Sequence, residues 1–246
     1  MLALAIACAA PGFAGAVITL PSGNLIQMGV FDQGHLGFGS RGLFLPGVGD
    51  ALDALTPGCM CEGWGVSGNG IVGRASVDLG GISNITVDSF TSTASTATSV
   101  VHVTSLSTLQ VTQASAPSVG APGSLFANTV TITNTGATTI TDVRYTRSMD
   151  WDVPPTPFNE FVTIAGLPAT KLLFSNNNGF ATPNPLVNPG PTGGISAGLV
   201  TNVNFTDVGP TDHGAFFTFG FGDLAPGASQ TFKIFYGAAT SEASAL

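Results

Sequence analysis

The sequence predicts an all-β protein built from antiparallel β-sandwiches. Short alternating or β-branched runs recur along the chain, and each is bounded by Gly, Pro, Asn or Asp. No window repeats apolar residues at helical spacing over three turns. The composition is 43% hydrophobic and only 8% charged, which excludes a disordered chain, because disorder needs low hydrophobicity and high charge.

Eleven runs are predicted as strands. In order they cover residues 24–31, 71–77, 85–92, 99–104, 108–113, 126–134, 139–152, 161–164, 202–206, 215–222 and 230–237. Short helices are expected only at 50–55 and 240–246.

The first residues predict a secretory signal peptide. LALAIACAA is a short apolar run, and Ala14-Gly15-Ala16 follows it in the position of a cleavage site, so we assign residues 1–16 to a leader that is cleaved near Ala16. A lipoprotein signal at Cys8 is the weaker alternative. No later segment approaches the roughly 20 apolar residues that span a bilayer.

Charge restricts the partners. The formal net charge is −8, and the six Lys and Arg residues are scattered. Because phosphate neutralisation dominates affinity for nucleic acids, we exclude that class of partner, and the same shortage of cations disfavours an anionic membrane surface.

Glycine and cysteine motifs carry little chemistry here. GFGSRG (37–42) and GWGVSG (63–68) match G-x-G-x-x-G, but neither leads into a helix, as a dinucleotide site requires. Cys59 and Cys61, in a C-x-C pair, are predicted to form a local disulfide that staples a loop, and a redox role is the alternative.

The segment 114–123 (ASAPSVGAPG) divides the predicted domains as a linker or long loop. Residues 17–113 form a β domain or half of a shared sandwich, and 124–246 form an immunoglobulin-like sandwich. Phe217, Phe219 and Phe221 are expected to pair with the strand at 230–237 in a hairpin closed by Pro226-Gly227.

The run 144–152 (RYTRSMDWD) has one apolar face and one polar face. We interpret the polar face, with Asp150 and Asp152, as solvated. The first alternative is a Ca²⁺ site or a structural ion pair, and the second is a catalytic pair that would also involve Glu160.

Arg147 falls on the apolar face of that run, and a buried Arg must be paired. Asp212 is the chosen partner, with Glu160 and Asp223 as alternatives. The pair Asp212-His213 itself is interpreted as part of a hydrogen-bonded loop.

The longest loop, 174–198, is dense in Asn, Pro and Gly. Long loops often carry function, so Asn176, Asn177 and Asn178 are candidate binding residues, and Trp64 is a further candidate.

Several motifs together resemble a group of secreted bacterial proteins, many of which carry a PEP-CTERM sorting tail. They are CMCEGWGVS (59–67), GGISNITVDSF (80–90), TITNTG (131–136), RYTRSMDWDVPPTPFNEFVTI (144–164), NNGFATPNP (177–185) and DHGAFFTFGFGDLAPG (212–227). The resemblance implies export and sorting to the cell surface, and it brings no activity and no catalytic residues. The sequence departs from the group at Thr146, which precedes Arg147 where the group often has a second Arg. It also ends at Leu246 without Pro-Glu-Pro, so we expect either a fragment or a freely secreted paralogue.

We therefore expect a non-enzymatic extracellular or cell-surface protein of a bacterial envelope or biofilm matrix. Its partners would be extracellular polysaccharide or other envelope proteins, and it would need no cofactor except possible Ca²⁺. The alternative is a secreted carbohydrate-binding or carbohydrate-hydrolysing protein that uses Trp64, Trp151 and the three acids named above.

Overall fold

The chain folds into fifteen described strands and one short 3₁₀ helix, η1 (Phe38–Ser40). The computed structural model describes residues 14–23, 25–46, 53–55, 57–152, 154, 156–165, 167, 169–191 and 200–239. The strands are β1 (Gly15–Thr19), β2 (Gln27–Phe31), β3 (Leu43–Phe44), β4 (Glu62–Gly68), β5 (Ile71–Ser76), β6 (Ile85–Ser92), β7 (Ala97–Val103), β8 (Leu106–Pro117), β9 (Leu125–Asn134), β10 (Ile140–Asp150), β11 (Glu160–Ile164), β12 (Leu172–Asn176), β13 (Phe205–Thr211), β14 (Gly214–Leu224) and β15 (Ser229–Gly237).

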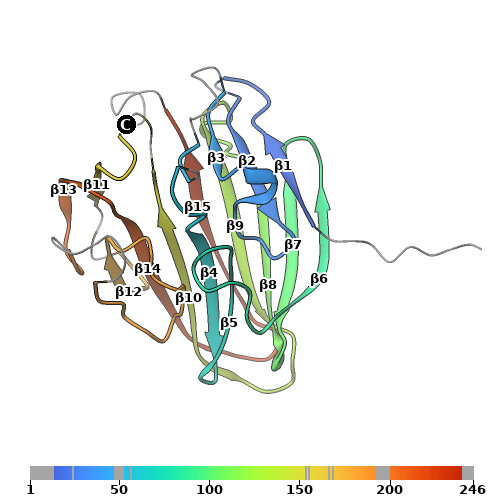
Figure 1. Cartoon of the computed structure of the whole chain (residues 1–246). Coiled ribbons are helices and arrows are strands. Elements are labelled where there is room, and N and C mark those ends of the chain that lie inside the picture. The colour runs from blue at the N-terminus through green and yellow to red at the C-terminus, as the bar shows by residue number, and fades with distance from the viewer. Residues whose placement is uncertain are drawn as a thin grey trace, which may run out of the picture.

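Two five-stranded antiparallel sheets form the sandwich (Figure 1). One has the order β12-β14-β10-β4-β5 and the other β15-β9-β8-β7-β6. Two smaller sheets, β1-β2-β3 and β11-β13, accompany them. The predicted all-β sandwich is confirmed.

The main core lies between the two five-stranded sheets. Trp64, Val66 and Tyr145 of one sheet pack with Val111 and Ile132 of the other, and all five are buried. The Trp64 and Tyr145 rings stack with centroids 5.9 Å apart. Each such side chain contributes about 1.5–3 kcal/mol by leaving water, so this layer dominates the stability of the fold.

A second core lies under the β1-β2-β3 sheet. Ile18, Met28 and Leu55 pack there with Phe126 of β9 and Tyr236 of β15, two strands of the second five-stranded sheet. The small sheet thus extends the core beyond the two large sheets.

The proposed β14–β15 hairpin is wrong. β14 pairs with β10 and β12, whereas β15 pairs with β9, so the turn at 225–228 carries the chain from one sheet to the other. Phe221 and Phe232 still stack, with centroids 5.3 Å apart, because they face each other across the sandwich. Asn134 fixes this corner, since its Nδ2 donates to the carbonyl oxygens of Thr138 and Leu224 at 2.8 Å.

The predicted linker is also not a boundary. β8 runs through residues 114–117, and β10, from the C-terminal half, pairs with β4 from the N-terminal half. Strands from both halves therefore share both large sheets, and the C-terminal strands do not close a sandwich by themselves.

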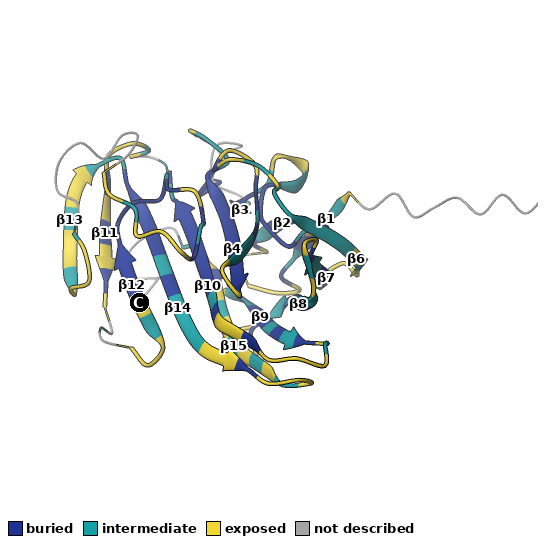
Figure 2. Cartoon of the chain, turned by 90° about the horizontal axis from the view of Figure 1, so that it is seen from below, coloured by how far each residue is buried: buried dark blue, intermediate teal, exposed yellow. Residues whose placement is uncertain are grey.

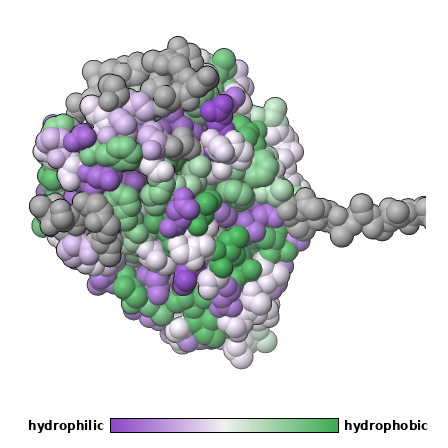
Figure 3. Space-filling view, in the orientation of Figure 1, coloured by the Kyte–Doolittle hydropathy of each residue, from purple (hydrophilic) through white to green (hydrophobic). Residues whose placement is uncertain are grey.

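The segment 177–185 lies against the outer face of β4. A Cβ atom on Gly65 would meet Pro183 O at 2.0 Å, so only glycine permits this contact. β10 is accordingly buried along most of its length, whereas β13 is largely exposed (Figure 2). Hydrophobic and hydrophilic residues are interspersed over the face seen in Figure 3.

Several expectations fall at the limits of the described chain. Residues 1–13 of the expected leader and the helix at 240–246 lie outside it, as do residues 50–52 of the other expected helix. Gly15 and Ala16 are the first residues of β1, so the expected cleavage near Ala16 falls inside a strand. Among the described residues, no helix has the length and apolar character needed to cross a bilayer.

Candidate metal centre

The polar face of β10 is buried, contrary to the expected solvated face. Thr146 and Ser148 are fully buried, and Asp150 and Asp152 are each 1% exposed. Ser148 Oγ donates to Gly179 O at 3.1 Å, because the segment that covers β4 also covers this part of β10. The alternation of polar and apolar residues in β10 does not reveal that a distant segment of the chain covers its polar face. The sequence alone therefore did not predict this burial.

Three aspartates converge at the end of β10. Asp150 is its last residue, Asp152 follows two residues later, and Asp212 lies in the two-residue connection between β13 and β14. One ligand oxygen from each carboxylate lies within 4.8 Å of the others. Asp150 and Asp152 were candidates from the sequence, whereas Asp212 was assigned elsewhere.

Glu160 adds a fourth carboxylate. It is the first residue of β11, is 4% exposed and pairs with Thr211, the residue before Asp212. Electrostatic repulsion from Asp152 and Asp212 acts on its carboxyl group. We call Asp150, Asp152, Asp212 and Glu160 the acidic cluster.

The acidic cluster contains buried oxygens that have no partner. Among the described residues, no hydrogen bond of ordinary geometry reaches Asp150 Oδ1, either carboxyl oxygen of Asp152 or Glu160, or Asp212 Oδ1. Leaving a buried polar group unpaired costs about 1–3 kcal/mol, and more for a charged group. Such a concentration of unpaired oxygens is expected where an ion or protons complete the site.

Burial raises the pKa of the Asp150 carboxyl to about 8, and repulsion by the other three acids adds to the rise. Burial also raises the pKa of Glu160 to about 7, although nearby backbone amides partly offset it. The pKa values of Asp152 and Asp212 are raised by burial as well. Without a cation, this site therefore holds protons near neutral pH.

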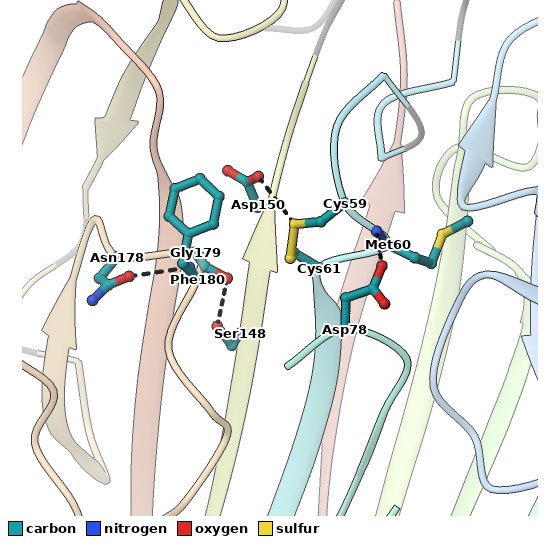
Figure 4. The surroundings of a disulfide bond; sticks show 9 residues. All are labelled: Cys59, Met60, Cys61, Asp78, Ser148, Asp150, Asn178, Gly179 and Phe180. Atoms are coloured by element: carbon teal, nitrogen blue, oxygen red, sulfur yellow. Dashed lines mark hydrogen bonds between the residues drawn. A yellow bond between two sulfur atoms is a disulfide. The ribbon is translucent and has the colours of Figure 1, made fainter. Parts of the chain in front are cut away.

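The Cys59–Cys61 disulfide borders the acidic cluster (Figure 4). Cys59 Sγ lies 3.9 Å from Asp150 Oδ2, and because a disulfide sulfur has no proton, any hydrogen bond here must come from a protonated Asp150. Gly58 brings this loop against the site: a Cβ at that position would meet Asp152 Oδ2 at 2.5 Å. The bridge predicted from the C-x-C spacing thus shapes one wall of the cluster.

The donors suit a hard divalent cation. All are carboxylate oxygens, which Ca²⁺ prefers in flexible sets of six to eight ligands. His213 lies next to Asp212 in the chain, but its Nδ1 accepts a hydrogen bond from Asn177 Nδ2 at 3.0 Å, and burial lowers its pKa. It therefore adds no charge to the site.

Arg147 is buried, as expected, but its predicted partner is wrong. It forms an ion pair with Glu62, which is fully buried, while Asp212 belongs to the acidic cluster. Arg147 Nη1 also donates to Gln113 Oε1 at 2.8 Å and to Tyr145 Oη at 3.1 Å.

Glu62 connects this pair to the rest of the molecule. Leu36 N donates to Glu62 Oε2 at 2.7 Å, and the Tyr236 hydroxyl donates to Glu62 Oε1 at 3.2 Å. Burial disfavours the Arg147 cation, but the Glu62 carboxylate together with Tyr236 and Tyr145 outweighs it, and the pKa of Arg147 is raised. This network links both large sheets to the β1-β2-β3 region, so its role is structural.

The candidate binding residues are not on the surface. Trp64 is fully buried, and its Nε1 donates to Gln33 O at 2.9 Å. Asn176, Asn177 and Asn178 are fully buried, and Asn176 Nδ2 donates to Pro189 O at 2.9 Å. These four side chains hold loops in place and offer no face to a glycan.

Burial also separates the acids from any large substrate. A glycosidase pair must contact the sugar, yet Asp150, Asp152 and Glu160 are all at most 4% exposed. The described geometry thus favours an enclosed ion over a polysaccharide.

No protein-family model matches the chain, and a search of curated proteins finds no match.

Proposed function

We propose that this chain is a non-enzymatic extracellular protein of a bacterial surface whose sandwich is stabilised by a bound Ca²⁺ ion. The observation that carries the proposal is the acidic cluster, in which three carboxylates meet within 4.8 Å and four of their buried oxygens lack a hydrogen bond of ordinary geometry among the described residues. Protons neutralise these carboxyl groups in the absence of a cation, and a divalent cation offsets two of their negative charges when they are ionised.

An extracellular setting supports the choice of Ca²⁺. The apolar leader run and the resemblance to surface-sorted proteins both indicate export. Extracellular Ca²⁺ modules bind with dissociation constants on the order of 10⁻⁴–10⁻³ M, which suits the millimolar Ca²⁺ outside cells. Polysaccharide and envelope proteins remain the proposed partners, through surfaces other than the buried residues described above.

Calorimetric titration of EDTA-treated, dialysed protein with CaCl₂ at pH 7.5 tests the proposal. We expect one Ca²⁺ per chain and loss of the binding heat in Asp150→Asn. The matched control is Asp223→Asn, an exposed acid at the far end of β14. Absence of binding in the folded wild-type protein would refute the proposed function.

A further inference from the structure

The acidic cluster lies where a small sheet leaves the sandwich. β11, β12 and β13 lie between β10 and β14 in the chain. β12 joins the large sheet beside β14, whereas β11 and β13 pair only with each other among the described strands. Four connections therefore join the β11-β13 sheet to the large sheet: residues 151–159, 165–171, 177–204 and 212–213. Asp152 lies in the first connection and Asp212 in the last, so the cluster occupies two of the four points of attachment. The β11-β13 sheet lies at the left edge of the molecule in Figure 1.

Few apolar contacts hold this sheet against the sandwich. Val162 and Ile164 of β11 pack with Ala215 of β14, and the partly buried Trp151 and Phe217 adjoin them. The other side of β11 faces solvent, and Phe161 is 58% exposed. A unit with a small buried contact and an exposed backbone opens more readily than the core sheets.

The carboxylates of the acidic cluster are divided between the large sheet that contains β10 and the small β11-β13 sheet. Asp150 belongs to the large sheet through its pairing with Gly214, whereas Glu160 belongs to the small sheet through its pairing with Thr211. When these carboxylates are ionised and no cation is bound, their repulsion acts directly across the junction. A cation bound among them reverses the sign of that interaction.

We propose that the Ca²⁺ ion is a clamp that holds the β11-β13 sheet on the sandwich, and that its removal lets this sheet detach while the two large sheets stay folded. The inference rests on the proposed function, because it assigns a structural consequence to the same cation. It makes the β11-β13 sheet a segment whose exposure follows the external Ca²⁺ concentration.

Hydrogen–deuterium exchange read by mass spectrometry, in EDTA and in saturating CaCl₂, tests the clamp. A ligand at 10–100 times its dissociation constant slows exchange through the detached state by about 10- to 100-fold. We expect this slowing in peptides covering 160–164 and 205–211 at exchange times too short for global unfolding, when peptides covering β8 and β9 stay protected in both solutions. Calorimetric Ca²⁺ binding with unchanged exchange at 160–164 and 205–211 would overturn the clamp and leave the proposed function standing. Absence of binding would overturn both.

Two variants, one on β13 and one directly after it, separate the clamp from general stability. Asp212→Asn removes a ligand from the attachment point, and we expect Ca²⁺ to lose its effect on β11 and β13 exchange. Asp207→Asn is the control, because Asp207 is exposed, lies on β13 and has a φ of 50° that Asn tolerates. We expect it to behave like wild type.

The variant Val162→Ala tests the clamp without changing any ligand, so the test does not depend on the folding of Asp212→Asn. It trims the apolar contact and leaves all four carboxylates in place. The clamp predicts faster exchange of β11 and β13 in EDTA and restored protection in Ca²⁺. Equal exchange of this variant in EDTA and Ca²⁺, with calorimetric binding retained, would contradict it.

Discussion

Three carboxylates of the acidic cluster, those of Asp150, Asp152 and Glu160, are buried where a proton or a cation must neutralise them, and Asp212 is half-buried beside them. Asp150 and Glu160, whose pKa values rise to about 8 and about 7, show this most clearly. Carboxyl groups of the unfolded chain have pKa values near 4. In the absence of a cation, the folded protein thus retains protons that the unfolded chain has released.

This difference fixes the sign of the pH dependence. Between about pH 4 and pH 8 the cation-free folded state binds more protons than the unfolded chain, so its free energy of unfolding falls as pH rises. We predict a higher melting temperature in EDTA at pH 5.5 than at pH 8, measured by circular dichroism. Asp150→Asn should reduce the difference. A melting temperature in EDTA that rises over this range would contradict the assignment of these pKa values.

Protons also compete with the cation. Because the ligands must be ionised to bind Ca²⁺, the rise in melting temperature on adding Ca²⁺ should be larger at pH 8 than at pH 5.5. Paired melting curves at both pH values measure it. A rise of equal size at both would show that the ion binds elsewhere.

The Arg147–Glu62 pair predicts a large loss of stability on truncation. Arg147→Ala leaves a fully buried Glu62 carboxylate without its cation, and such losses reach about 3–5 kcal/mol. The control is Arg144→Ala, which removes the partly exposed pair with Asp142 and should cost less than about 1 kcal/mol. Urea denaturation of both variants measures the difference. Equal stabilities would show that the buried network contributes nothing.

At the residue scale, the sequence predicted the burial of Arg147 better than it predicted the partner that Arg147 contacts. The apolar neighbours of Arg147 predicted a buried, paired cation, and that is what the structure has. Its partner, Glu62, lies 85 positions earlier in the chain, in a strand that the sequence did not reveal. Asp212 was therefore assigned to Arg147, although its long-range neighbours are Asp150 and Asp152.

Among the elements, β4 shows why alternation alone is an incomplete guide. Its sequence, EGWGVSG, places Gly63, Gly65 and Ser67 at alternate positions on one face, and the whole strand is buried. The glycines accommodate the segment 177–185 on the outer face, so a polar–apolar pattern has no reason to appear. The same segment explains why a polar face of β10 is buried.

Gly65→Ala tests that explanation. Its Cβ would meet Pro183 O at 2.0 Å, so either β4 or the covering segment must move. Overpacking of this kind costs typically about 1–3 kcal/mol. Gly120→Ala, where a Cβ meets nothing within 4 Å, is the control and should change the free energy of unfolding little. If both variants unfold at the same urea concentration, the close contact is not present in solution.

The turn after β14 shows a second reason why local sequence does not predict which strands pair. Pro226-Gly227 was correctly placed between two aromatic strands, and the Phe221 and Phe232 rings do meet. Facing rings arise equally from neighbouring strands and from strands in opposite sheets. Local sequence therefore identified the turn and the contact, but it did not distinguish a hairpin from a crossing between sheets.

For the whole molecule, the interleaved strand order makes the two halves depend on each other. In isolation, β9 would lose β8 and β10 would lose β4, which exposes the core between the sheets. We predict that a fragment covering 124–239 does not fold. Dispersed amide signals in its proton–nitrogen correlation spectrum would contradict this, and the full chain provides the reference spectrum.

The sequence was sufficient for the fold class because alternation and turn residues are local properties. Strand order was not recoverable, and neither was the choice between two domains and one shared sandwich, because both depend on which distant strands pair. Three members of the acidic cluster, Asp150, Asp152 and Glu160, were candidates from the sequence, whereas Asp212 was assigned to Arg147. Their meeting with Asp212 required the β11-β13 sheet to return beside β10.

The central claim is that this sandwich is stabilised by Ca²⁺ at the acidic cluster. Its most direct test is the melting temperature of the full chain at pH 7.5 in EDTA and in 10 mM CaCl₂. With a dissociation constant on the order of 10⁻⁴–10⁻³ M, saturation adds about 1.4–2.7 kcal/mol, or roughly 3–10 °C. We predict that rise for wild type and its absence in Asp150→Asn. An unchanged wild-type melting temperature would contradict the account.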